Sequence, residues 1–298
     1  MKCAISGGTG FIGRRIVERL LRDSHYVGVW SRKPGLEQRT GVASYTWDPL
    51  EGEPPAESVN TMDAIIHLAG EPVAQRWNTE VKRRIRDSRV LGTRRLVDAI
   101  GRVKHKPKVL VCASAIGYYG ERGEEELTES AGPGKGFLAE TCKAWEAEAD
   151  RAAEFGLSVM KLRIGFVLGR DGGALAKMAP AFRWGVGGRL GSGRQWMPWI
   201  HVDDVAELFV HAAENGLSGV WNATAPNPVR NAEFTREMAS AVHRPALFPV
   251  PAFALKIAFG ELGQHMLDSA RVVPAAAVKA SFRFQYPEVG GALRNLLR

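Results

Sequence analysis

Cysteine is scarce in this 298-residue sequence, and its three cysteines, Cys3, Cys112 and Cys142, follow no metal-binding spacing. We therefore expect no metal site, and we expect reduced, buried thiols in a cytoplasmic protein. Long apolar runs are also missing, so no segment is predicted to span a membrane and no membrane partner is expected. The first apolar run follows directly after Lys2, so we expect no secretion signal.

Acidic residues are in deficit, with 32 Asp and Glu against 40 Lys and Arg, and the net charge is +8. The densest basic stretch, residues 82–95, interleaves its charges with apolar residues at helical spacing. This pattern is typical of the solvated face of a helix, so nucleic acid is not an expected partner. The length suits one nucleotide-binding domain with an attached lobe.

Glycine is concentrated near residue 10, where an apolar run at 3–5 leads into Gly7, Gly10 and Gly13 and then into an amphipathic helical pattern. The order of strand, glycine turn and helix is typical of a dinucleotide site. Its glycines permit a tight turn, a close approach of the pyrophosphate, and close packing of helix against strand. The helix N-terminus attracts the phosphates. An ordinary turn is the alternative. We expect cofactor contacts at Gly7, Thr9, Gly10, Phe11, Ile12 and Gly13.

The second predicted strand, residues 26–30, is followed by Ser31, Arg32 and Lys33. Dinucleotide folds that select NAD usually have an acid here, which binds the 2′-hydroxyl of the ribose. A guanidinium and an ammonium instead attract a 2′-phosphate. We therefore predict NADP (NADPH) as the cofactor, with contacts at all three residues. A solvated basic loop ahead of Pro34 is the alternative.

Strand and helix patterns alternate along the rest of the chain. The fold class predicted is α/β, a Rossmann-like doubly wound parallel sheet with a smaller C-terminal substrate lobe. Residues 1–165, joined by 199–225, are expected to form the dinucleotide-binding domain, and residues 166–198 and 226–298 the lobe. Further strands are predicted at 42–48, 63–70, 109–115, 159–166 and 219–224, and helices at 78–103, at 137–155 and after Asp203, the expected N-cap.

Ligands of open α/β sheets bind at the carboxyl ends of the strands. Ser114 lies at such an end, in the run 109–115, and is therefore a candidate site residue. His67 lies inside an apolar run, so we expect it to pack in the core without a catalytic role. Further cofactor contacts are expected at Leu68, Ala69, Gly70, Glu71, Ser88, Ala113, Arg163 and Gly165.

Several motifs together resemble the extended short-chain dehydrogenase/reductase superfamily, and within it the atypical epimerase-family proteins often labelled cell-division-inhibitor-like. The resemblance implies a Rossmann-like core that binds NADP and a C-terminal lobe that closes over a substrate cleft. It implies a small-molecule substrate without identifying it, and we expect a monomer or a homodimer. The motifs are residues 7–13, 31–34, 67–71, 114–120, 137–139, 145–146, 197–204 and 284–288.

The catalytic set of that superfamily is a serine with Tyr-x-x-x-Lys, in which the tyrosine transfers a proton. Ser114 matches the serine, but if Lys143 is the lysine, the tyrosine position holds Ala139, which cannot transfer a proton. We expect Tyr118 or Tyr119 to supply the phenol, with Lys143 at the nicotinamide ribose. Packing between the lobes is the alternative for either tyrosine.

Three functions therefore remain open. The favoured one is an NADP-dependent oxidoreductase or epimerase with relocated acid–base groups. The others are a non-catalytic NADPH-binding sensor or scaffold, and an epimerase that keeps its cofactor bound as a redox carrier. The glycine-rich segment 185–193 either clamps an anionic substrate with Arg183, Arg189 and Arg194 or is a flexible connector.

Overall fold

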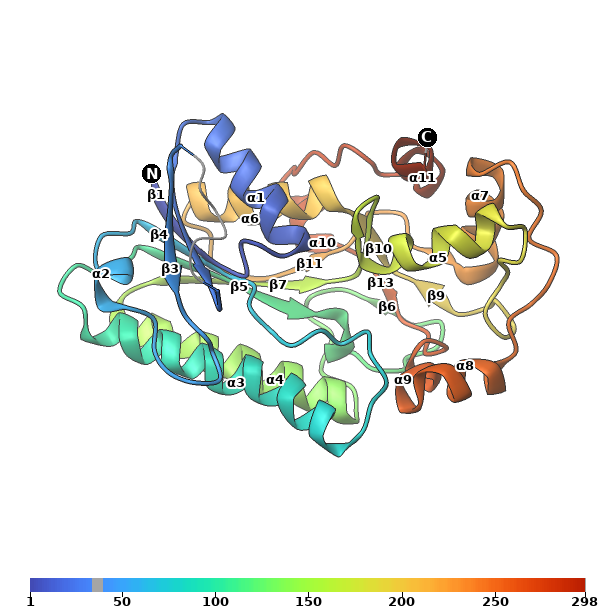
Figure 1. Ribbon diagram of the computed structural model, residues 1–298, viewed down its shortest axis with the longest axis horizontal. Coiled ribbons are helices and arrows are strands. Elements are labelled where there is room, and N and C mark those ends of the chain that lie inside the picture. The colour runs from blue at the N-terminus through green and yellow to red at the C-terminus, as the bar shows by residue number, and fades with distance from the viewer. Residues whose placement is uncertain (34–39, 298) are drawn as a thin grey trace.

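A seven-stranded parallel sheet forms the centre of the computed structural model, which describes residues 1–33 and 40–297 (Figure 1). Each neighbouring pair of strands is parallel, so the predicted fold class is confirmed. The chain adds strands outward from β1 on both sides, which places the topological switch point, where such sheets bind ligands, between β1 and β4. In spatial order the strands are β11 (Gly219–Ala223), β7 (Ser158–Ile164), β5 (Val109–Ala115), β4 (Ala64–His67), β1 (Lys2–Ser6), β2 (Tyr26–Ser31) and β3 (Val42–Thr46).

Helices cover both faces of this sheet. In Figure 1, α1 (Phe11–Arg22) and α6 (Val202–Glu214) lie above it and contact each other. The second pair, α3 (Thr79–Arg102) and α4 (Phe137–Asp150), lies below it. Burial on both faces explains why the strands are almost continuously apolar rather than alternating.

The other elements are short and mostly C-terminal. Those near the sheet are α2 (Ala56–Val59), β6 (Glu126–Leu127) and two 3₁₀ turns, Ile116–Tyr118 and Arg151–Phe155. The rest are β8 (Phe166–Gly169), α5 (Gly173–Arg183), β9 (Trp196–Met197), β10 (Trp199–His201), β12 (Val229–Arg230), α7 (Asn231–Ala241), α8 (Ala252–Phe259), α9 (Glu261–His265), β13 (Arg271–Val272), α10 (Ala275–Lys279) and α11 (Val289–Leu297).

Two main clusters of buried apolar side chains match this arrangement. The larger one surrounds the sheet and includes Ile5, Val29 and Leu110. A second cluster joins α5, α7 and α11 through Phe182, Phe234 and similar residues. In Figure 1 these C-terminal helices gather at the right-hand end of the molecule.

His67 ends β4 and is completely buried. Its Nδ1 is 2.6 Å from Ser6 Oγ and its Nε2 is 3.1 Å from Thr93 Oγ1, so both ring nitrogens have partners. Burial and, as a smaller cause, the charge of Arg89 together lower the pKa of His67 to about 3, so the ring is neutral at neutral pH. The expectation of a packed core histidine is confirmed.

The expected N-cap of α6 is wrong by two residues. The helix begins at Val202, and His201 is its N-cap: the Asp203 N–H donates to His201 Nδ1 at 3.1 Å. Asp203 lies in the first turn instead, where its negative charge still interacts favourably with the positive end of the helix dipole.

Candidate functional site

A cavity of about 500 Å³ opens at the carboxyl ends of the central strands, beside the switch point of the sheet. Its lining combines the glycine loop, the segment after β4, the end of β5, and one face of α4. A concave, largely apolar site of this size suits a small-molecule ligand or cofactor. Of the residues predicted from sequence, it is lined by Gly7, Gly10, Phe11, Ile12, Gly13, Leu68, Gly70, Ala113, Ser114 and Gly165.

The glycine loop between β1 and α1 does not accommodate a side chain at Gly7 or at Gly13. Gly7 has φ +71°, in the left-handed region that favours glycine. A Cβ atom on Gly13 would lie 2.2 Å from the Gly7 carbonyl oxygen, far inside contact distance. Gly10 caps α1 without a side-chain hydrogen bond, so the N–H groups of the first turn remain for a ligand. The loop has the form that a phosphate-binding turn requires.

The segment Ser31 to Lys33 and the glycine loop leave the sheet at the same level. Ser6, the last residue of β1, pairs with Trp30, so Gly7 and Ser31 follow neighbouring positions of the two strands. Ser31 is buried, and its hydroxyl donates to the Lys33 carbonyl at 2.5 Å, which shapes the turn. Arg32 and Lys33 are exposed. Pro34, the last residue of this motif, lies outside the described residues.

Eight of the expected cofactor contacts are not among the residues that line the cavity: Thr9, Ser31, Arg32, Lys33, Ala69, Glu71, Ser88 and Arg163. The Glu71 N–H donates to Ser88 Oγ at 2.9 Å, and the Glu71 carboxylate pairs with Arg84. Ser88 therefore supports the segment after β4 from below. The contact of these two residues with a cofactor remains a prediction.

Ser114 heads a buried polar network (the Ser114 network). Its hydroxyl donates to Glu146 Oε1 at 2.6 Å, and Arg163 donates to both oxygens of Glu146 at 2.8 Å. Arg163 also donates to the Tyr119 hydroxyl at 3.0 Å, and that hydroxyl donates to Asn222 at 2.7 Å. Burial opposes the charge of Arg163, but the hydrogen bonds to Glu146 outweigh it and hold the Arg163 pKa above its ordinary value.

The two tyrosines expected to supply a phenol are part of this network or packed against it. Tyr119 is fully buried, and burial raises the pKa of its hydroxyl although Arg163 opposes the rise. Tyr118 stacks on Arg163, with the guanidinium carbon 3.4 Å from the ring centre. Neither tyrosine is among the residues that line the cavity.

The residues of α4 that line the cavity are shifted by one position from those expected from the sequence, 139 and 143. Leu138 and Cys142 line the cavity, one turn apart, whereas Lys143 is exposed and Ala139 is buried away from the lining. The inward positions at the spacing of the superfamily's tyrosine and lysine are therefore Leu138 and Cys142. Burial raises the pKa of Cys142 to about 11, so its thiol stays protonated at neutral pH.

Two further polar residues of the cavity were missed by sequence reasoning. Thr141 lines it and is buried, but its hydroxyl has no hydrogen-bond partner in the described part of the chain. Arg89 also lines it: Nη1 donates to the carbonyls of Glu71 (2.9 Å) and Ile85 (3.0 Å), and no carboxylate among the described residues pairs with it. Burial lowers the Arg89 pKa, as expected for a cation without an anionic partner. The only signal in the sequence was the place of Arg89 beside Ser88.

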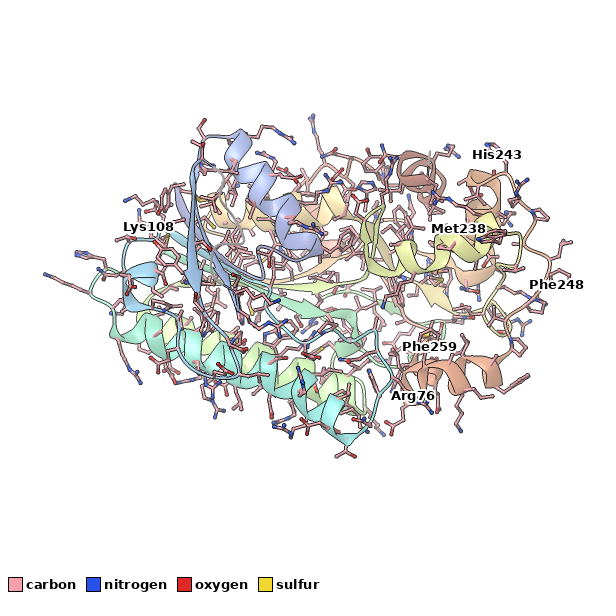
Figure 2. The ribbon with its side chains drawn as sticks, in the orientation of Figure 1. Arg76, Lys108, Met238, His243, Phe248 and Phe259 are labelled. Carbon is pink, nitrogen blue, oxygen red and sulfur yellow. The ribbon has the colours of Figure 1, made fainter. Side chains whose placement is uncertain are left out.

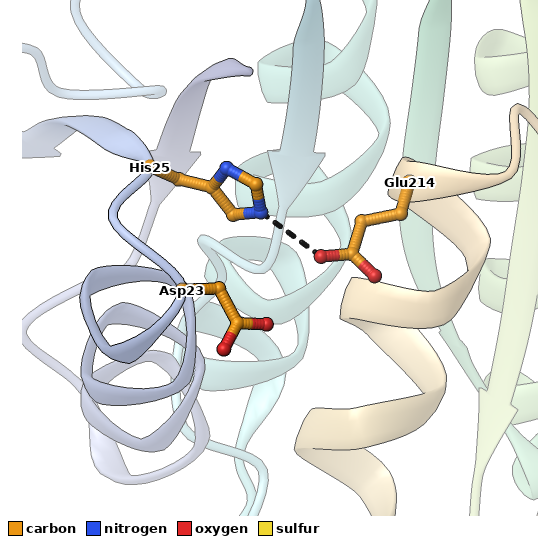
Figure 3. A group of neighbouring side chains, drawn as sticks. All are labelled: Asp23, His25 and Glu214. Atoms are coloured by element: carbon orange, nitrogen blue, oxygen red, sulfur yellow. Dashed lines mark hydrogen bonds and ion pairs between the residues drawn. The ribbon is translucent and has the colours of Figure 1, made fainter.

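Figure 3 shows the one group of three metal-ligating side chains found among residues 1–33 and 40–297: Asp23, His25 and Glu214. His25 contacts the Met1 amine (2.9 Å) and Glu214 (3.0 Å), and Asp23 pairs with Arg19. His25 precedes β2, so the group lies at the amino-terminal ends of the strands, whereas the cavity lies at their carboxyl ends. We assign no metal to it, because its ligand atoms already have partners.

The sequence and the structure were compared with those of known proteins. Residues 3–223 match the NAD dependent epimerase/dehydratase family, and residues 250–296 match a domain of unknown function, DUF1731. The chain is 41% identical to the epimerase family protein SDR39U1 homolog, chloroplastic, of Arabidopsis thaliana, across 100% of this chain and 87% of that protein. It is 38% identical to the epimerase family protein YfhF of Bacillus subtilis, across 100% and 98%.

Among solved structures, that of the human epimerase family protein SDR39U1 with NADPH superposes with a TM-score of 0.89 at 34% identity, covering 100% of this chain and 99% of that one. UDP-glucose 4-epimerase of Thermus thermophilus, at 22% identity and a TM-score of 0.80, shares the fold. The chain belongs to the NAD-dependent epimerase/dehydratase family.

Proposed function

We propose that the chain is an NADP-dependent oxidoreductase or epimerase of a small molecule. The observation that carries this proposal is the continuity of one cavity from the glycine loop, where a dinucleotide phosphate fits, to Ser114 at the end of β5. The similarity to a protein crystallised with NADPH supports the choice of cofactor. Arg32 and Lys33 support a 2′-phosphate on the adenosine side.

The residues present fit this cofactor. The backbone from Gly10 to Gly13 would hold the pyrophosphate, because no side chain caps the N–H groups at this N-terminus of α1. Arg89 would neutralise an anionic group inside the cavity, since it lacks a carboxylate partner among the described residues. The bound nicotinamide would supply or accept a hydride.

Proton transfer would fall to Ser114 rather than to a tyrosine. Because its hydrogen is donated to Glu146, Ser114 Oγ presents lone pairs to the cavity and can accept the proton of a substrate hydroxyl. Its own proton can then pass to Glu146, which Arg163 holds in place. At the α4 positions of the tyrosine and lysine stand Leu138 and Cys142, and neither provides an acid–base group for this step.

The test is hydride transfer, followed by the absorbance of the reduced cofactor against secondary alcohols, ketones, aldehydes and nucleotide sugars. We expect turnover with one of these classes, a kcat lowered about 100-fold or more in Ser114→Ala, and little change in KM. Tyr118→Phe is the matched control, since Tyr118 does not line the cavity. An unchanged kcat in Ser114→Ala would refute the proton route.

A second function, a non-catalytic NADPH-binding sensor, is favoured by the inward positions of α4. Neither Leu138 nor the protonated thiol of Cys142 replaces a tyrosine–lysine pair. On this proposal the chain binds NADPH tightly but oxidises it with no member of the panel, and Ser114→Ala binds it as well as the unmodified chain does.

A further inference from the structure

Large apolar side chains are exposed mainly in two segments of the C-terminal part. Nine are exposed among residues 1–33 and 40–297, and only Tyr26, Phe166 and Val278 lie elsewhere. Trp184 is 83% exposed and Leu247 75%. We call the set the apolar tip: Trp184, Val186, Leu247, Phe248, Phe253 and Ile257. A concentration of this kind on one part of a surface marks a contact site.

Backbone contacts join the two segments of the apolar tip. The Val250 N–H donates to the Arg189 carbonyl at 2.8 Å, and the Gly191 N–H donates to the Val250 carbonyl at 2.9 Å. Gly188 packs directly on the backbone of Phe248. Segments 184–191 and 247–250 therefore run side by side, and α8 follows after Pro251.

On α8, most apolar side chains are turned outward. Only Leu255 is buried, while Phe253 and Ile257, four residues apart, share an exposed face with Lys256 beside them. Figure 1 shows α8 and the segment before it at the end of the molecule away from α2, and Figure 2 labels Phe248 at the edge of that end. The six side chains of the apolar tip are each between 63% and 83% exposed, so most of their surface is open to solvent.

The charge of these segments has one sign. Residues 172–202 and 238–260 contain no Asp or Glu, but they contain six Lys and Arg. Four of these are exposed in or next to the apolar tip: Arg183, Arg189, Arg244 and Lys256. The first acid after α8, Glu261, is paired with Lys82 at 2.7 Å. A second copy of this surface would bring like charges together, which disfavours a symmetric dimer through it.

We propose that the apolar tip docks the protein on a bilayer that carries anionic lipids. Exposed Trp, Phe and Leu side chains can enter the interfacial region without a matching groove, and the surrounding guanidinium and ammonium groups pair with lipid phosphates. This contact is peripheral, since none of the helices in the described residues is apolar and long enough to cross a membrane. It would revise the expectation of no membrane partner.

The test is co-sedimentation of the full chain with sucrose-loaded vesicles of phosphatidylcholine, alone or mixed with phosphatidylglycerol. We expect binding to the mixed vesicles that weakens with added salt, and much less binding to phosphatidylcholine alone. Replacing Phe253 and Ile257 together by Ser removes two side chains that would enter the lipid, so the partition coefficient should fall at least about tenfold.

Val278→Ser is the matched control, because Val278 is an exposed apolar residue of α10 outside the apolar tip. Leu247→Ser with Phe248→Ser repeats the test on the loop, in case α8 does not tolerate substitution. NADPH titration shows that each variant is folded. Absence of binding to mixed vesicles overturns the proposal, as does an equal loss in Val278→Ser. Loss of a dimer in the Phe253 and Ile257 variant, without vesicle binding by the unmodified chain, would identify a second copy as the partner instead.

Discussion

On the cavity wall formed by β1 and α1, backbone atoms leave no freedom: Gly13 has no room for even one methyl group. On the opposite wall, formed by α4, the residues that line the cavity are Leu138, Thr141, Cys142 and Trp145. None of these side chains is charged, and the Thr141 hydroxyl has no hydrogen-bond partner among the described residues. One wall meets the steric demands of a dinucleotide and the other lacks the superfamily's proton-transfer pair. The geometry of the phosphate-binding turn and the presence of a proton-transfer pair are therefore separate features of this cavity.

The difference between the walls has a physical basis. A phosphate-binding turn depends on main-chain geometry, so nearly any side chain disrupts it. Proton transfer depends on a side chain within reach of the substrate, and several elements can supply one. In the function proposed above, Ser114 at the end of β5 takes this role, and its hydroxyl donates to Glu146 of α4.

The largest effect is expected from Gly13→Ala. The added Cβ would lie 2.2 Å from the Gly7 carbonyl oxygen and 2.7 Å from Gly8 Cα, so the loop must move. We expect loss of measurable NADPH binding in calorimetry and a free energy of unfolding lower by about 1–3 kcal/mol. Gly132→Ala is the control, because a Cβ there meets nothing within 4 Å. Normal binding by Gly13→Ala would contradict the steric account of this wall.

The Ser114 network is expected to give the next largest effect. Arg163→Met leaves the Glu146 carboxylate buried without its cation, which should lower the free energy of unfolding by about 3–5 kcal/mol in urea titrations. Arg102→Met removes an exposed pair with Glu53 and should cost less than about 1 kcal/mol. Similar losses in the two variants would mean that the network adds no more stability than a surface pair.

The next effect depends on pH and comes from His67, which is buried at the end of β4 and is not among the residues that line the cavity. Its folded pKa of about 3 lies below the ordinary value of 6.5, so the unfolded chain binds the proton first. The stability from neutral His67 is present above pH 6.5 and is lost as the pH falls toward 3. We expect it to contribute about 2 kcal/mol of destabilisation near pH 5.

Urea titrations of the unmodified chain and of His67→Gln at a series of pH values isolate this contribution. The glutamine cannot titrate, so the gap between the two stability curves should narrow as the pH falls from about 7 to about 5. Parallel curves would show that His67 does not stay neutral in the folded state.

Much of this architecture was predictable from sequence, because buried parallel strands are apolar runs and the glycine spacing is sterically determined. The predicted strand at 109–115 has the bounds of β5, and the predicted helix at 78–103 agrees with α3 within one residue at either end. The register of α4 was not predictable: without the tyrosine as a reference, Lys143 and Cys142 differ by only about 100° around the helix. Arg89 was missed because a basic helix face hides one inward guanidinium among its exposed charges.

The smallest effect is expected at the tip of β2, where exposed side chains rather than backbone select the cofactor. Arg32→Ala removes a guanidinium that would pair with the 2′-phosphate, so the Kd for NADPH should rise roughly tenfold while the Kd for NADH stays unchanged. Calorimetry with both nucleotides measures this, and Arg22→Ala, an exposed arginine at the end of α1, controls for the general loss of positive charge. If Arg32→Ala changes the Kd values for NADPH and NADH equally, Arg32 does not contact the 2′-phosphate, and Lys33 would have to provide the selectivity. Because Arg32 is exposed and screened by solvent, its contribution should also shrink with added salt, unlike the effect of Gly13.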